Sequence, residues 1–79
     1  MVEAKVDRRL NCIGLYCPEP VIKTREELDK MQVNEVLEVQ ADDPAAESDI
    51  RSLAKHLHDE VLSVTKKENV TTMLIKKNK

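Results

Sequence analysis

The sequence predicts an α+β fold, in which two helices cover one face of a four-stranded mixed sheet in the order β-α-β-α-β-β. Two stretches with apolar residues at helical spacing alternate with stretches of period two, as expected for helices packed on strands. The chain has 79 residues, which suits a single small domain over residues 1–79. Each helical connection permits parallel neighbouring strands, whereas the short final link requires an antiparallel pair.

The first half of the chain predicts a strand, a helix and a second strand. Residues 2–11 alternate loosely between apolar and polar side chains, which is typical of a strand. Residues 18–31 predict a helix, and Pro18 suits its first position because the N–H that proline lacks would be unpaired there. Residues 35–41 have period two and predict the second strand. The apolar stripe of the helix consists of Val21, Thr24, Leu28 and Met31, with Ile22 beside it.

The second half predicts a helix followed by a hairpin. Asp-Asp-Pro at 42–44 combines an acidic cap with a proline suited to a first helical turn, and the helix should end near His58. Its apolar stripe consists of Ala46, Ile50, Leu53, Ala54 and Leu57. Strands are expected over residues 60–66 and 70–77, joined by a short hairpin link. The uncovered sheet face would bear some of Val36, Val61 and Leu74. It could serve as a dimer or partner surface, although scattered exposed aliphatic residues are common on small proteins.

Composition argues against several functions. Thirteen basic and fifteen acidic residues give a net charge of -2, so no positive field attracts nucleic acid, and one tyrosine provides no stacking platform. The chain has no apolar run of membrane-spanning length and no signal-peptide layout, so we expect a cytoplasmic protein without membrane insertion. It has no glycine-rich nucleotide motif, and no cofactor is predicted. His56 and His58 lie on different helix faces, and no metal site is predicted.

The stretch 11–20 stands out because it holds both cysteines, the only glycine, the only aromatic residue and two of the three prolines. Gly14 marks a loop, since glycine takes positive φ without steric cost. If the helix begins at Pro18, Cys17 is its N-cap, where the helix dipole and the N–H groups of Glu19 and Val21 favour a thiolate. The prolines stiffen this turn.

The expected activation of Cys17 is modest. A helix terminus stabilises a nearby charge by about 0.3–1 kcal/mol, less than the roughly 1.36 kcal/mol of one pKa unit, and Glu19 opposes it by like charge. A persulfide is more acidic than a thiol and would be held more fully as an anion. Cys12 follows Leu10 by two residues and is expected to point into the core, with a resolving thiol as the less favoured interpretation.

Residues 10–20, Leu-Asn-Cys-Ile-Gly-Leu-Tyr-Cys-Pro-Glu-Pro, resemble the D-x-x-G-x-x-C-P-x-P signature of the TusA (SirA-like) sulfur-carrier family. The resemblance continues to Ala-Asp-Asp-Pro-Ala at 41–45. It implies that Cys17 receives sulfane sulfur as a persulfide from a cysteine desulfurase or rhodanese-like donor. The sulfur would pass to an acceptor protein, for example in tRNA thiolation or sulfur metabolism. Such a protein is a covalent carrier rather than an enzyme that turns over small molecules.

The resemblance also implies roles for the neighbours of Cys17 and leaves alternatives open. Gly14 would shape the loop, and Pro18 and Pro20 would fix the helix start. Asn11 replaces the family's usual aspartate and can hydrogen-bond the loop, but it cannot act as a base. The alternatives are a thiol-redox module that uses Cys12 with Cys17, and a non-catalytic, partner-binding regulatory protein. A monomer or weak dimer is expected.

Overall fold

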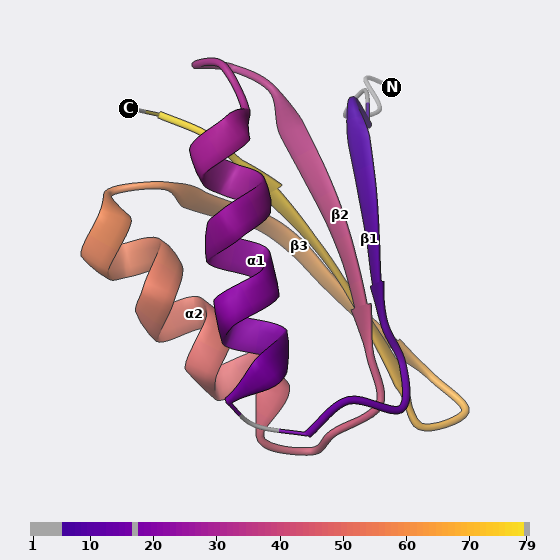
Figure 1. Cartoon of the computed structure of the whole chain (residues 1–79). Coiled ribbons are helices and arrows are strands. Elements are labelled where there is room, and N and C mark those ends of the chain that lie inside the picture. Colours follow the sequence, from indigo (N-terminus) through magenta and orange to yellow (C-terminus); the bar gives the residue numbers. More distant parts are fainter. Residues whose placement is uncertain (1–5, 17, 79) are drawn as a thin grey trace.

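The computed structural model describes residues 6–16 and 18–78, and this part of the chain folds in the predicted order (Figure 1). The sheet order is β1-β2-β4-β3, with β1 parallel to β2 and the other neighbouring pairs antiparallel. The predicted α+β fold with a mixed sheet is therefore confirmed. The elements are β1 (Arg8–Cys12), α1 (Glu19–Lys30), β2 (Val36–Ala41), α2 (Ala46–Leu57), β3 (Glu60–Lys67) and β4 (Val70–Lys76).

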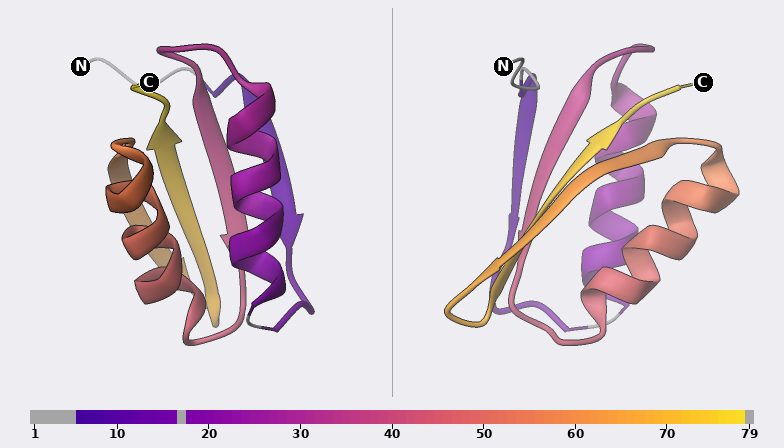
Figure 2. Two further views of the ribbon diagram at one scale, coloured as in Figure 1. Left: turned by 60° about the vertical axis from the view of Figure 1, so that its left-hand side comes forward. Right: turned by 180° about the vertical axis from the view of Figure 1, so that it is seen from behind.

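Both helices pack on the same face of the sheet, as predicted (Figures 1 and 2). Helix α1 contacts β1 and β2, α2 contacts β3 and β4, and the two helices contact each other. Both helices begin at the end of the molecule where β1 and β2 finish, and the β3–β4 hairpin turns at that same end. Three connections therefore gather at one end of the fold.

The core lies between the sheet and the helices. Leu37 and Val39 of β2 pair with Ile75 and Met73 of β4, and all four side chains are fully buried. Burying an aliphatic side chain of this size contributes about 1.5–3 kcal/mol. The apolar stripes predicted for the two helices also face this core. Their buried members are Thr24 and Leu28 of α1, Met31 directly after α1, and Ala46, Ile50 and Ala54 of α2.

The largest differences from the predicted element boundaries are at the starts of β1, α1 and α2, and the other boundaries agree within one residue. Strand β1 begins at Arg8 rather than residue 2, and residues 1–5 lie outside the described part. The N-cap of α1 is Pro18, and its first helical residue is Glu19. Helix α2 begins at Ala46 after an Ala45 cap, because the Asp43 carboxylate accepts the Ala45 N–H in the turn before the helix.

The uncovered face of the sheet carries Leu74 and Val36, as expected, because Leu74 pairs with Glu38 and Val36 alternates with buried Leu37. Of the three candidates for this face, Val61 does not lie on it. Val61 pairs with Ile75 and packs against the core. A register shift between residues 61 and 63 then changes the alternation along β3. The uncovered face therefore carries two of the three aliphatic residues that were candidates for it.

The β3–β4 link is a two-residue turn made by Glu68 and Asn69. Their φ values of 50° and 69° are both positive, which is the backbone of a type I′ hairpin turn. The predicted hairpin is confirmed, and β3 extends one residue further than expected, to Lys67. Among the described residues, no helix is long and apolar enough to cross a membrane.

Candidate functional site

The candidate site is built at the carboxyl ends of the parallel strands β1 and β2. Cys12 is in register with Ala41, so the loop after β1 and the loop after β2 begin side by side. The carboxyl ends of parallel strands are the usual location of ligand-binding and reactive groups in sheets with helical crossovers. The fold therefore brings the first residues of the loop after β1 close to the first residues of the loop after β2.

Local hydrogen bonds shape the loop after β1. The Asn11 Oδ1 atom accepts the Ile13 N–H at 2.9 Å, and the Cys12 carbonyl accepts the Leu15 N–H at 3.1 Å. Gly14 has φ of 86°, in the left-handed region that favours glycine. A Cβ atom built on Gly14 would meet no heavy atom within 4 Å. Glycine is therefore favoured here by the positive φ angle of the backbone, and not by a lack of space for a side chain.

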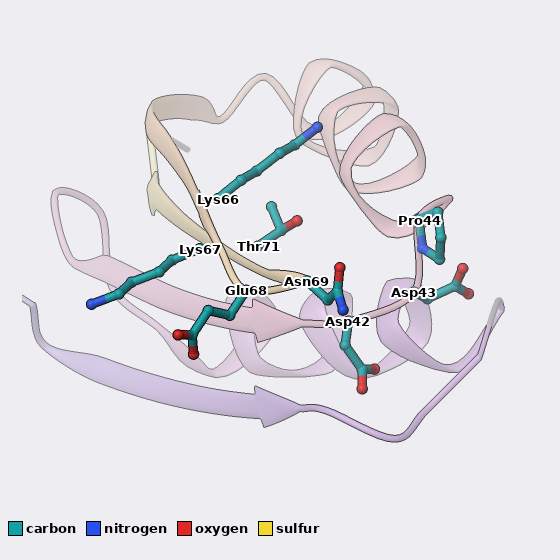
Figure 3. Close-up of a pocket in the computed structure, with 8 residues that line it drawn as sticks. All are labelled: Asp42, Asp43, Pro44, Lys66, Lys67, Glu68, Asn69 and Thr71. Atoms are coloured by element: carbon teal, nitrogen blue, oxygen red, sulfur yellow. The ribbon is translucent and has the colours of Figure 1, made fainter.

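Asp42 connects this loop to the neighbouring one. The Gly14 N–H donates to Asp42 Oδ1 at 2.9 Å, across 28 positions of sequence. Figure 3 shows the Asp42 carboxylate directed toward the loop that follows β1. Asp42 was predicted to belong to the cap of the second helix, and its contact with Gly14 was not predicted. The expectation that β1 and β2 are parallel was the signal that could have placed Asp42 beside the loop.

The start of α1 closes the other end of the loop. The Glu19 N–H donates to the Tyr16 carbonyl at 2.9 Å, and the Ile22 N–H donates to the Pro18 carbonyl at 3.0 Å. Cys17 itself lies outside the described residues. The expectation that Cys17 is the N-cap was wrong by one residue. The expectation that the Glu19 N–H serves a sulfur anion is also wrong, because that N–H is bonded to Tyr16.

Apolar side chains are exposed on both sides of position 17. The exposed fraction is 73% for Tyr16, 44% for Ile13 and 50% for Ile22 on the first turn of α1. Pro20, in contrast, is fully buried and anchors the start of the helix to the core. Exposed apolar side chains therefore both precede and follow position 17 in the sequence.

Cys12 is a core residue. Its side chain is fully buried and its thiol is free. Burial raises the pKa of the Cys12 thiol, and the nearby Lys23 ammonium counters this only in part. The thiolate is the reactive form of cysteine, so a buried thiol with a raised pKa is inert. The expectation that Cys12 packs in the core is confirmed, and this burial argues against the redox alternative.

Two depressions flank the loop. A shallow groove of about 530 Å³ lies between the start of α1 and α2, and its lining includes exposed His56. A hollow of about 580 Å³ lies between the loop after β2 and the hairpin (Figure 3). Lys66 points from this hollow toward α2, where its Nζ atom lies 2.7 Å from Glu47 Oε1. Within residues 6–16 and 18–78, no group of three or more His, Cys, Asp or Glu residues could hold a metal ion.

Comparison with known proteins identifies the family. Residues 8–77 match the family model described as sulfurtransferase TusA. The chain belongs to the TusA family. A protein of Archaeoglobus fulgidus named "Putative sulfur carrier protein" is 48% identical over 62 residues, which make up 78% of this chain and 80% of that protein. A protein of Aquifex aeolicus with the same name is 43% identical over 77 residues, or 98% of this chain, which spans 39% of that relative's length.

A solved structure shares the TusA-like fold. The crystal structure of a SirA-like protein from Desulfitobacterium hafniense superposes with a TM-score of 0.81 at 19% identity, over 91% of this chain and 99% of that one. The resemblance inferred from the Cys-Pro-x-Pro stretch is confirmed. Membership of the TusA family supports a sulfur-carrier role that involves protein partners.

Proposed function

We propose that this TusA-family domain is a sulfur carrier whose reactive group is the Cys17 thiol. The observation that carries the proposal is the contrast between the two cysteines in the chain. Cys12 is buried in the core, whereas the residues next to Cys17 in sequence, Tyr16 and Pro18, are both exposed. Cys17 is also the cysteine of the family signature, and both observations support it as the carrier thiol.

The transfer takes place in two displacement steps. The Cys17 thiolate attacks the outer sulfur of a donor persulfide, so that a new S–S bond forms, the donor's S–S bond breaks and the donor leaves as a thiolate. An acceptor thiolate then attacks the outer sulfur of the Cys17 persulfide and releases the Cys17 thiolate. The sulfur moves without net oxidation or reduction. Each step therefore needs only a close approach of two sulfur atoms from different proteins.

The surroundings of Cys17 favour docking by such partners. The exposed side chains of Ile13, Tyr16 and Ile22, which precede and follow Cys17 in the sequence, provide apolar contact area for a partner. We infer a cysteine desulfurase or rhodanese-like donor in the cytoplasm, and an acceptor protein of tRNA thiolation or another branch of sulfur metabolism. The domain would act as a monomer or weak dimer, without contacting nucleic acid itself.

The test is transfer of sulfur to the protein by a cysteine desulfurase supplied with cysteine, followed by intact mass measurement. The wild-type protein and Cys12→Ala should each gain the mass of one sulfur atom, whereas Cys17→Ser should gain none. Cys12→Ala is the matched control because it removes the other thiol with a small change in volume. Absence of loading on the wild-type protein, while a known carrier loads beside it, would contradict the proposal.

A further inference from the structure

We propose that Asp42 is a positioning residue for sulfur transfer, because its carboxylate holds the loop that leads to Cys17. The inference rests on the proposed function of Cys17 and adds a residue to it from a different segment of the chain. Its basis is the hydrogen bond of 2.9 Å from the Gly14 N–H to Asp42 Oδ1. The Asp42 side chain is half-buried, between the loop and the hollow shown in Figure 3.

The sheet register explains why these two residues meet. Cys12 and Ala41 are partners at the ends of the parallel strands β1 and β2. Asp42 is the first residue after β2, and Gly14 is the second residue after β1. Any chain that keeps this register brings the two positions together. Their contact is therefore set by the parallel pairing and not by local sequence.

The Asp42 contact differs from the other hydrogen bonds of the loop. Those made by Asn11 Oδ1, the Cys12 carbonyl and the Tyr16 carbonyl each join residues two or three positions apart, and so they fix the shape of the loop. The bond to Asp42 fixes the place of the loop relative to the sheet, because β2 is a buried interior strand. A carboxylate is the stronger choice for this purpose, since hydrogen bonds to a charged acceptor are about twice as strong as neutral ones.

The loop is thus held at both ends. Asp42 holds it at Gly14, and the bond from Glu19 to Tyr16 ties it to α1. Cys17 follows Tyr16 directly in the sequence, so a shift of the loop changes the approach available to an attacking sulfur. A misplacement of about 1 Å can slow a reaction by roughly 100-fold.

The test compares Asp42→Ala, Asp42→Asn and Glu68→Gln. Because Gly14 is the only glycine, its amide signal is readily assigned by NMR. In Asp42→Ala, the Gly14 amide should exchange about tenfold to 100-fold faster, and Cys17 should load sulfur about tenfold to 100-fold more slowly. Asp42→Asn retains an oxygen acceptor and should largely restore both rates. Glu68→Gln removes a carboxylate charge from the hairpin, which lines the same hollow, but leaves Asp42 in place, so both rates should stay at the wild-type level.

Each outcome separates this inference from the proposed function. Loading of Asp42→Ala at the wild-type rate would overturn the positioning role and leave the sulfur carrier intact. Slow loading of Asp42→Asn, while its Gly14 amide stays protected from hydrogen exchange, would also overturn the positioning role. If the wild-type protein takes up no sulfur, the proposed function fails. The positioning role is then decided by the alkylation rate of Cys17 with a small thiol reagent, which must differ between Asp42→Ala and Asp42→Asn.

Discussion

The loop after β1 and the β3–β4 hairpin lie at the same end of the molecule but are held in different ways. The hairpin is a two-residue turn in which Glu68 and Asn69 both take positive φ, and the paired strands on each side fix it completely. The loop after β1 joins a strand to a helix, so no backbone pairing between its two flanking elements holds it in place. It depends on Gly14 for its shape and on Asp42 for its place. A loop between a strand and a helix suits a reactive thiol, because the position of such a loop can be adjusted without changing the core.

Of the three substitutions that follow, Gly14→Ala should have the largest effect, and it acts on the loop after β1. An L-residue with a side chain pays about 1–2 kcal/mol in the left-handed region, and φ at Gly14 is 86°. We expect a lower free energy of unfolding by this amount, or a displaced loop with slower sulfur loading of Cys17. Urea unfolding and mass measurement of loading check the two effects. Unchanged stability together with unchanged loading would show that the loop does not depend on this backbone conformation.

Asn11→Ala should have a smaller effect on the same loop. It removes the acceptor of the Ile13 N–H at an exposed site, and one hydrogen bond contributes about 0.5–1.5 kcal/mol. Asn11→Asp keeps the acceptor and restores the residue of the family signature, so it should match or exceed the wild-type stability. Thermal unfolding of the wild-type protein, Asn11→Ala and Asn11→Asp gives the order of their stabilities. If Asn11→Asp is as unstable as Asn11→Ala, the side chain does not act through this hydrogen bond.

Glu47→Gln should have the smallest effect, and it acts on the contact between α2 and the β3–β4 hairpin. Hydrogen bonds from Lys66 of β3 and then from Arg51 lower the pKa of the Glu47 carboxyl. Its contribution to stability is therefore complete above the unfolded pKa of about 4.3 and is lost as pH falls through the lower folded pKa. Acid unfolding of Glu47→Gln should depend less steeply on pH in this window than that of the wild-type protein. Identical pH profiles would contradict this assignment.

Periodicity alone was sufficient for the elements with strong local signals. The stripe from Ala46 to Leu57 and the period-two run around Leu37 and Val39 placed α2, β2 and much of the core correctly, because burial requires those spacings. The helix starts were less accurate. Proline and aspartate are favoured over several positions of a first turn, so Pro18 and Asp43 were each assigned one or two residues away from their observed roles.

The sequence by itself determined the layer architecture, much of the core, the burial of Cys12 and the family resemblance, since each depends on residue types at short and regular spacing. The tertiary structure decided that Val61 faces the helices, that the Glu19 N–H is bonded to Tyr16, and that Asp42 holds Gly14. The physical reason lies in the sheet. A register shift in β3 and the parallel pairing of β1 with β2 set contacts between positions far apart in the chain, and local sequence patterns carry no record of such contacts.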